Sequence, residues 1–499
     1  MDLLANLGLG FAVALTLKNL AYCFLGVTLG TLIGVLPGIG PVATIAMLLP
    51  ITFNLPPESA LIMLAGIYYG AQYGGSTSAI LVNMPGEASS VVTAIDGYQM
   101  ARQGRAGAAL SIAAIGSFFA GCVGTLLIAA FAPPLAALAF KFGPPERFSL
   151  YVLGLVAAVV LAHGSLIKAL AMIALGLLLG IVGTDVTSGT QRYTFGIANL
   201  SDGIGFAIVA MGMFGIAEII RSLENVDKRE VFTANVTGLW PTRDDLKASW
   251  KAILRGTGLG SILGVLPGGT AVLASFASYT LEKRVAGPNS KFGKGAIEGV
   301  AGPEAANNAA AQTSFIPMLT LGIPSNPVMA LMVGAMIIQG IQPGPQVMTQ
   351  RPELFWGMIA SMWVGNILLV LLNLPLIGIW IRLLKVPYRL LYPAILLFCC
   401  IGVYSLNNSV MDVMLAALFG LIGYVFIKLD CEPAPLLLAF VLGPMMEEEL
   451  RRSVNTARGD WMVFLNRPLS LSLLLVAAAL LLIIVAPNIR KKREEAFQE

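Results

Sequence analysis

Long apolar stretches recur along most of the chain and are separated by short polar segments. A transmembrane helix needs about 20 mainly apolar residues, and we count about eleven to twelve segments that approach this length. The pattern therefore predicts an all-α integral membrane protein. Five representative apolar stretches are Leu110–Ala132, Leu150–Ala162, Ala169–Val182, Gly357–Ile381 and Leu469–Ala486.

A nine-residue motif occurs twice in the chain. Gly30–Gly38 has the sequence GTLIGVLPG and Gly260–Gly268 has GSILGVLPG, with six identical positions and an offset of 230 residues (260 − 30). An offset of about half the chain predicts an internal duplication. The predicted units are a first transmembrane repeat (1–222), a polar linker (223–250), a second repeat (251–466) and a C-terminal helix with a cytoplasmic tail (467–499).

A second match follows each copy of the LPG motif. Ser76–Ser78 precedes Asn83–Gly86 in the first half, and Gln312–Ser314 precedes Gly322–Ser325 in the second. Two matched features in the same order make chance similarity a poor explanation. We therefore expect two structurally related halves.

Loop charges indicate that the two repeats have opposite orientations. The loop Thr52–Ser59 after the first LPG has no Lys or Arg, whereas the loop after the second LPG is basic. After the next pair of breaks the difference is reversed: the loop that follows Pro85 is more basic than the loop that follows Pro324. Cytoplasmic loops are enriched in Lys and Arg. Inverted-topology repeats, common in secondary transporters, explain this pattern; a parallel duplication with uninformative loop charges is the alternative. The basic residues compared are Lys283, Arg284, Lys291 and Lys294, then Arg102 and Arg105 against Arg351.

Each LPG segment is predicted to interrupt a helix. Ala252–Leu281 would be roughly 45 Å long as one continuous helix, which exceeds the roughly 30 Å hydrocarbon core. Basic residues flank both ends of this segment. They favour a re-entrant hairpin that returns to the same side over a broken span.

The composition narrows the function classes. Hydrophobic residues make up 57% of the chain and charged residues 12%, about half the share of an ordinary soluble protein. The net charge of +4 is too small and dispersed to predict nucleic-acid binding. His163 is the only histidine, at a predicted helix end, and neither a P-loop nor a CxxC pair is present. These features predict a protein that is not an enzyme and has no cofactor.

Four helix breaks carry the candidate chemistry. They are LPGIGP at Leu36–Pro41, Pro85–Glu87, LPGGT at Leu266–Thr270 and Pro324–Pro327. A helix N-terminus presents free N–H groups and about half a positive charge, so it binds a carboxylate. The alternative is that these Gly and Pro residues serve only close helix packing.

Neutral polar residues gather near the same breaks. Their oxygens and freed backbone carbonyls predict a sodium site, and their donors predict contacts to substrate; hydrogen bonding between helices is the alternative for each. The cluster comprises Gln72, Ser76, Thr77, Ser78 and Asn83 in the first half, and Asn307, Asn308, Thr313, Ser314 and Asn326 in the second. The sodium candidates among them are Asn83, Ser78, Asn308 and Ser314.

Five acidic residues near segment ends are further candidates, for carrying a coupling proton. A position in a loop or at an interface is the favoured interpretation for each of them. They are Glu87, Asp96, Asp185, Glu218 and Glu304.

Several longer motifs resemble the large membrane subunit of the tripartite tricarboxylate transporter family, over nearly the whole chain. The resemblance is carried by GTLIGVLPGIGP (Gly30–Pro41), DGYQMARQGRAG (Asp96–Gly107), RYTFG (Arg192–Gly196), PEAANNAA (Pro303–Ala310), LGIP (Leu321–Pro324) and QPGP (Gln342–Pro345).

This resemblance implies a multi-pass permease of the bacterial inner membrane for citrate-like tricarboxylates, dicarboxylates or related acids, driven by a sodium or proton gradient. It also implies a small four-helix membrane subunit and a periplasmic solute-binding protein that delivers substrate. The implied substrate site comprises Gly38, Ile39, Gly40, Pro41, Ser76, Thr77, Ser78, Asn83, Pro85, Gly86, Gly268, Gly269, Thr270, Asn307, Asn308, Thr313, Ser314, Pro324 and Ser325.

The two half-sites are expected to differ. The second LPG is followed by Gly269–Ala271 where the first has Ile39–Pro41. Glu87 stands where a smaller polar residue is expected in many relatives, which bears on substrate choice. An elevator-like secondary transporter is the favoured hypothesis, and a carboxylate channel or a scaffold subunit without ion coupling is the alternative.

Overall fold

The computed structural model describes residues 3–36, 40–161, 165–185, 188–224, 236, 238–266, 270–287, 290–383 and 388–485. Helices dominate these ranges, and one short antiparallel ladder joins β1 (Gly183–Thr184) to β2 (Gln191–Arg192). His163, predicted at a helix end, lies outside the described residues, as do 225–235 of the predicted linker.

The first half of the chain contains the following helices. They are α1 (Leu3–Ala14), α2 (Leu17–Val35), α3 (Pro41–Thr52), α4 (Pro57–Val82), η1 (Ala88–Ser90), α5 (Val91–Arg102), α6 (Ala106–Ala139), α7 (Pro144–Leu161), α8 (Leu166–Gly180), η2 (Ala198–Leu200), α9 (Phe206–Ala210), the π-helical η3 (Met211–Ile216) and α10 (Ala217–Glu224).

The second half repeats the early part of this order. Its helices are α11 (Arg243–Val265), α12 (Ala271–Ala286), α13 (Glu298–Thr313), α14 (Phe315–Leu321), α15 (Pro327–Ile338), α16 (Gln346–Gln350), α17 (Pro352–Asn373), α18 (Ile377–Leu383), α19 (Tyr388–Asn407), α20 (Val410–Lys428), α21 (Ala434–Thr456), α22 (Val463–Asn466) and α23 (Pro468–Val485).

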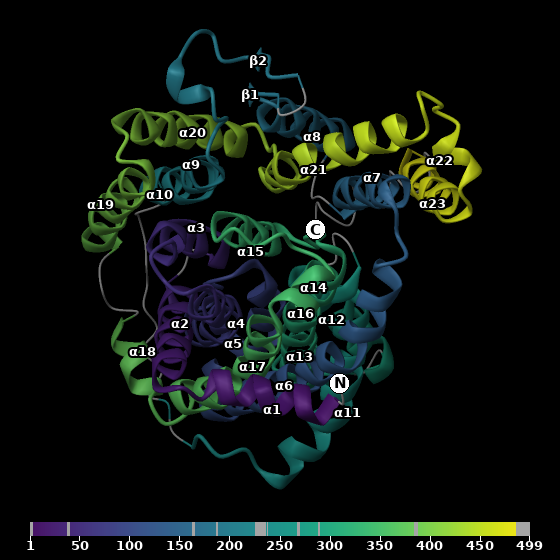
Figure 1. Cartoon of the computed structure of the whole chain (residues 1–499). Helices are drawn as coiled ribbons and strands as arrows, with labels where there is room; N and C mark the ends of the chain where they lie inside the picture. Colours follow the sequence, from purple (N-terminus) through teal and green to yellow (C-terminus); the bar gives the residue numbers. More distant parts are fainter. Residues whose placement is uncertain are drawn as a thin grey trace.

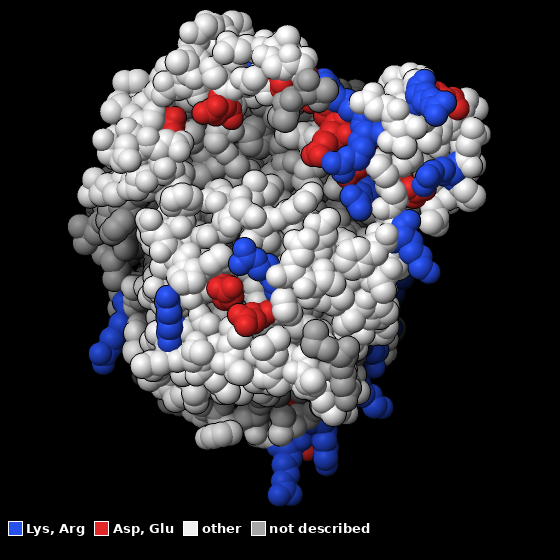
Figure 2. All heavy atoms as spheres, viewed as in Figure 1, with Lys and Arg blue, Asp and Glu red and all other residues white. Residues whose placement is uncertain are grey.

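The prediction of an all-α membrane protein is confirmed. Four described helices, α2, α6, α17 and α20, are long and apolar enough to cross a membrane, and shorter apolar helices accompany them. Large apolar side chains such as Leu17 and Leu482 are exposed. On the face seen in Figure 2 most of the surface is uncharged, and a mixed group of acidic and basic residues lies near α7 and α21. Such a surface suits contact with lipid.

The helices form a compact body with a second layer beside it (Figure 1). The body contains α1–α6 and α11–α18, and the layer contains α7–α10 and α19–α23, so both sequence halves contribute to each. Within the layer, α21 packs on α7 and α8, and α23 packs on α7. The body meets the layer through α3, which contacts α19 and η3, and through α15, which contacts α21.

A stripe of glycines brings α2 against α4. A Cβ on Gly26, Gly30 or Gly34 would lie 2.3–2.4 Å from a backbone carbonyl oxygen of α4. Glycine at every fourth position lets two backbones approach this closely, because it carries no side chain. The helix pair is thus fixed by residues that the apolar pattern alone does not distinguish. The facing residues of α4 are Met63, Ile67 and Ala71.

The second half repeats this packing. A Cβ on Gly256, Gly260 or Gly264 of α11 would lie 2.1–2.4 Å from a carbonyl oxygen of α13. The facing residues are Gly302, Ala306 and Ala310, which follow their counterparts in α4 by 239 residues (302 − 63). The duplication expected from the LPG motifs therefore has a counterpart in three dimensions. Equivalent helices make equivalent contacts.

Candidate functional site

Besides the LPG motifs, each half has one further helix break; the one in the first half, called the first break from here on, follows α4. Asn83 adopts the left-handed conformation (φ 55°) and ends the helix, and the chain resumes helical structure at η1. Gly86 is pressed against α2, because a Cβ there would lie 1.6 Å from the carbonyl oxygen of Gly34. Ser78 donates a hydrogen bond to the same carbonyl at 3.5 Å and to the Gly75 carbonyl at 3.1 Å. The break is therefore anchored beside the end of the first LPG arm.

The second break follows α14 and has the same form. Gly322 is also left-handed (φ 73°), and it follows Asn83 by 239 residues (322 − 83), the offset of the glycine contacts. Pro324 then corresponds to Pro85, and Asn326 to Glu87. This structural match differs by three residues from the pairing of Ser76–Ser78 with Gln312–Ser314 predicted from sequence. The shift arises because short polar triplets carry less register information than the helix ends.

The helix that follows each LPG motif packs on the helix that follows the break of the other half. Helix α12 contacts η1, which follows the first break, and α3 contacts α15, which follows the second break. Likewise α13 contacts α5, and α4 contacts α15. The breaks are thus interleaved across the two halves around α4 and α13.

The LPG tips themselves, residues 37–39 and 267–269, lie outside the described residues. The predicted ligands Gly38, Ile39, Gly268 and Gly269 fall in these tips, whereas Gly40, Pro41 and Thr270 are described at the starts of α3 and α12.

The helix starts after the breaks are capped in different ways. Gly40 offers no side-chain cap to α3, and Pro41 occupies its first position. Thr270 Oγ1 accepts the Leu273 amide of α12 at 3.2 Å. Asn326 Oδ1 accepts the Met329 amide of α15 at 2.9 Å. Since a side-chain cap occupies an amide that would otherwise bind an anion, α3 has the more open N-terminus.

One face of α4 connects both breaks through side chains spaced four residues apart. Tyr68 OH accepts a hydrogen bond from Asn326 Nδ2 at 3.4 Å. Gln72 Nε2 donates to Glu87 Oε1 at 2.8 Å, and Gln72 Oε1 accepts from Ser89 at 2.7 Å. One turn further, Ser76 faces α13. A single helix face therefore touches the polar residue that closes each break.

A buried polar cluster joins α4, α5 and α13. Glu304 Oε2 accepts from Ser76 Oγ and Oε1 accepts from Thr93 Oγ1, both at 2.5 Å. Glu304 is fully buried in the first half of α13. The expectation of a loop or interface position is therefore wrong for this residue. The sequence could not show which helices supply its hydroxyl partners.

The cluster extends to α6. Asn308 Nδ2 lies 2.8 Å from Ser117 Oγ, 3.1 Å from the Glu304 carbonyl oxygen and 2.6 Å from Asn307 Oδ1. Among the described side chains, several buried polar atoms of this region have no hydrogen-bond partner, and buried groups of this kind call for a ligand or a water. These atoms are Asn307 Nδ2, Asn308 Oδ1, both amide atoms of Gln312, and Glu87 Oε2.

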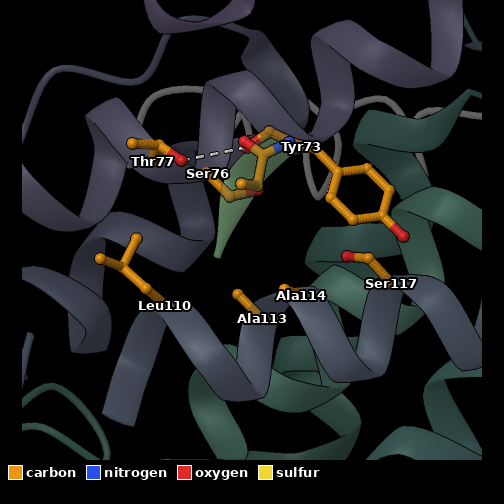
Figure 3. A pocket seen from close by; sticks show the side chains of 8 residues that line it. Tyr73, Ser76, Thr77, Leu110, Ala113, Ala114 and Ser117 are labelled. Carbon is orange, nitrogen blue, oxygen red and sulfur yellow. Dashed lines mark hydrogen bonds between the residues drawn. The ribbon is translucent and has the colours of Figure 1, made fainter. Parts of the chain in front are cut away.

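A small cavity adjoins this cluster (Figure 3). It has room for about one water molecule, and Ser76 and Ser117 contribute hydroxyls to its wall. Both serines also contact α13, through Glu304 and Asn308 respectively. A carboxylate substrate does not fit here. The lining residues are Tyr73, Ser76, Thr77, Leu110, Ala113, Ala114, Ser117 and Asn373.

Other predicted site residues are bonded to backbone. Thr313 donates to the Ala309 carbonyl at 2.9 Å, Ser314 to that of Ala311 at 2.7 Å, and Ser325 to that of Ser314 at 3.4 Å. Thr77 donates to the Tyr73 carbonyl at 3.4 Å. These hydroxyls are occupied within the fold, yet each retains lone pairs for a cation. Of the sodium candidates, Ser78 and Asn83 lie at the first break, Ser314 before the second, and Asn308 in the α13 cluster.

Residues that the sequence did not single out are Tyr68, Ser89, Thr93 and Ser117. The four-residue spacing of Tyr68, Gln72 and Ser76 was a usable signal for a polar helix face. Thr93 and Ser117 gave no such signal, because their roles depend on how α5 and α6 pack on α13.

Three of the remaining acidic candidates have partners that suit structural roles. Asp185 pairs with Arg451 at 2.8 Å, and Glu218 lies 3.6 Å from Arg221. Asp96 accepts backbone amides at the entry to α13, from Gly295 at 2.8 Å and Ala296 at 2.9 Å.

The chain is similar in sequence to two proteins of Agrobacterium vitis. An uncharacterized 52.8 kDa protein in the TAR-I ttuC' 3' region of Agrobacterium vitis is 61% identical over the whole chain and 99% of its own length. An uncharacterized protein in the TAR-II ttuC' 3' region of the same organism is 60% identical over 240 residues, which is 48% of the chain and 99% of that protein. No solved structure matches.

The family comparison covers both LPG motifs, both breaks and the polar cluster. The model of the tripartite tricarboxylate transporter TctA family matches residues 20–438. This is a transporter family, and the match agrees with the resemblance in the sequence motifs. The chain belongs to the tripartite tricarboxylate transporter TctA family.

Proposed function

We propose that this chain is the permease subunit of a secondary active transporter that imports tricarboxylates or dicarboxylates, using a sodium or proton gradient. The observation that carries the proposal is the interleaving of the two halves: the helix that follows each LPG motif packs on the helix that follows the break of the other half. In this proposal, helix ends near α4 and α13 bring backbone amides and carbonyls from both halves to one region. Anion and cation sites in secondary transporters are built from such ends.

The two halves are proposed to be inverted-topology repeats, with re-entrant hairpins at the LPG motifs. The loop-charge pattern supports opposite orientations, and the equal offsets of the glycine contacts and the left-handed helix ends support a common fold of the halves. In this arrangement the body carries the substrate and moves against the α7–α10 and α19–α23 layer in an elevator-like motion. The layer contacts the body mainly through α3 and α15, which directly follow breaks.

The substrate carboxylates are proposed to bind at the open N-terminus of α3 and at the LPG tips Gly38–Pro41 and Gly268–Thr270. Residues near the breaks, Ser76–Ser78 and Asn83–Gly86 in the first half with Asn307–Asn308 and Pro324–Ser325 in the second, contribute the remaining contacts. Few basic side chains lie in these apolar segments, so backbone amides are the available anion ligands.

Membership of the family supports a proposal about partners and location. A small four-helix membrane subunit and a periplasmic solute-binding protein are proposed to complete the system in a bacterial inner membrane. The binding protein would deliver the acid, which lets the permease work at low external concentrations.

Reconstitution tests the proposal. The chain and its two partners are placed in proteoliposomes, and uptake of radiolabelled citrate, malate, succinate and tartrate is followed with imposed sodium and proton gradients. We expect at least one acid to accumulate above equilibrium, and accumulation to stop when ionophores collapse both gradients. Equilibration without accumulation would indicate a carboxylate channel instead, and no flux at all would indicate a scaffold subunit.

The charge on Glu87 is expected to influence substrate choice. Glu87→Gln can keep a hydrogen bond to Gln72, and it removes the negative charge that Glu87 carries beside the first break at alkaline pH, where uptake is therefore compared. The KM of a tricarboxylate should fall severalfold relative to that of a dicarboxylate, since about 1 kcal/mol of repulsion corresponds to roughly a fivefold change. Uptake kinetics with citrate and succinate measure the ratio, with the exposed Glu353→Gln as control. An unchanged ratio would remove Glu87 from the selectivity argument.

A further inference from the structure

Glu304 differs from the seven other acidic residues that are buried in the described part of the chain. Five of these seven pair with an arginine that fixes their negative charge. Glu87 is partly exposed and is not among them. Asp96 accepts two backbone amides, and Asp412 lies in the first turn of α20, where the helix dipole favours a negative charge. The five arginine pairs are Glu146–Arg467, Asp185–Arg451, Asp245–Arg105, Glu282–Arg255 and Glu449–Arg147.

The hydrogen-bond partners of Glu304 can bond to its carboxyl group in both the ionised and the protonated form. Ser76 and Thr93 hold both carboxyl oxygens through hydroxyls. A hydroxyl donates to a carboxylate and, after rotation, accepts from a carboxylic acid, whereas an arginine or a backbone amide only donates. The surroundings therefore stabilise both the ionised and the protonated carboxyl.

A small cavity adjoins the hydroxyl that bonds to the carboxyl. The cavity in Figure 3 has room for about one water, and Ser76 both lines it and donates to Glu304. Ser117 lines the same cavity and contacts Asn308, which lies one turn from Glu304. A water in this cavity would be linked to the Glu304 carboxyl through a single hydroxyl group, that of Ser76.

We propose that Glu304 is the proton-binding residue that couples proton flux to transport, loaded from the cavity through Ser76. An O–H bond forms between a carboxyl oxygen and a proton relayed from water, and the same bond breaks when the site opens to the other side. No other bond changes. The coupling role rests on the proposed transport function, whereas proton binding itself is measured without substrate.

Other charged or titratable groups face Glu304 from the helices around it. Tyr73 on α4 and Glu87 after the first break are close enough to interact with it electrostatically. On α13 itself, Gly299 abuts Asp96 of α5, and Gly302 abuts Glu282 of α12, which is paired with Arg255 of α11. The contribution from α6 near the carboxyl is the neutral Ser117. Ionisation of Glu87 favours a proton on Glu304, because the two negative charges repel.

Infrared difference spectroscopy of the purified chain tests proton binding. Spectra are recorded over a pH series from about pH 5 to pH 9, because burial disfavours the charged form of a carboxyl. We expect a protonated-carboxyl band that titrates in the wild type, disappears in Glu304→Gln and persists in the control Glu353→Gln. In Thr93→Val the carboxylate loses one donor, so the midpoint should rise by about one pH unit. A titrating band unchanged in both Glu304→Gln and Thr93→Val would overturn the assignment.

Vesicle assays test the coupling. With citrate, or another acid that the wild type accumulates, Glu304→Gln should still exchange internal for external substrate but lose accumulation driven by a proton gradient. Thr93→Val should still accumulate substrate, with its pH profile moved upward. If wild-type uptake is driven by sodium alone, or Glu304→Gln accumulates substrate normally, the proton role is refuted while the transport function stands. If the wild type transports none of the acids, the transport function itself fails.

Discussion

Replacing Gly86 with alanine is expected to reduce carboxylate uptake at least tenfold, because the added methyl group drives the first break away from the LPG arm. The new Cβ would lie 1.6 Å from the Gly34 carbonyl oxygen and 2.8 Å from its carbon. These are backbone atoms near the end of α2, so no side-chain rotation relieves the clash. Overpacking of this kind commonly costs about 1–3 kcal/mol, enough to shift a binding geometry that depends on helix ends.

The Gly86→Ala experiment needs a matched control and a check on folding. Gly258 lies on α11, and a Cβ added there would meet no atom within 4 Å, so Gly258→Ala should transport like the wild type. Both variants are compared by proteoliposome uptake and by thermal unfolding in detergent. Wild-type uptake by Gly86→Ala would show that the contact between the break and the LPG arm is irrelevant to transport.

Replacing Gly260 with valine is expected to remove most of the folded protein. Its Cβ would lie 2.1 Å from the Ala306 carbonyl oxygen and 2.8 Å from the Ala306 Cα, so α11 and α13 must separate. Separation also opens the neighbouring contacts of Gly256 and Gly264 on the same stripe. The cost should exceed the roughly 1–3 kcal/mol of ordinary overpacking, since a whole helix interface is affected.

Two further variants test whether the loss of folded protein comes from the contact between the glycine stripe and the facing helix. Gly258→Val, two residues away on the same helix, should give a monodisperse protein of wild-type stability. Gly30→Val should reproduce the defect in the first half, because its Cβ would lie 2.4 Å from the Ile67 carbonyl oxygen. Size-exclusion profiles and thermal midpoints measure both. A stable Gly260→Val protein would mean that the glycine stripes do not hold the two helix pairs together.

The sequence was informative about the fold where a physical constraint acts on neighbouring residues. Apolar run lengths predicted an all-helical membrane protein, and the repeated LPG motif predicted two related halves. Glycines spaced four residues apart, such as those that begin at Gly26 and Gly256, are visible in the sequence. The sequence does not show which helix they pack against. That information is long-range, since α2 packs on α4 and α11 on α13.

The candidate site was less predictable than the fold. Polar residues near the breaks were found from their apolar context, but partners such as Thr93 and Ser117 come from helices distant in sequence. The triplets Ser76–Ser78 and Gln312–Ser314 precede matched helix ends at different spacings, because Asn83 follows Ser76 by seven residues and Gly322 follows Gln312 by ten. Helix ends set by Asn83 and Gly322 fixed the register in three dimensions.

The central claim is that interleaved helix breaks of the two halves hold a carboxylate between them. The most direct test is a cryo-electron microscopy structure of the chain with a saturating concentration of an acid that it transports. Density for the acid should lie at the start of α3, against the LPG tips and the breaks that follow α4 and α14. Density bound elsewhere by basic side chains, with the breaks dry and packed by side chains, would contradict the account.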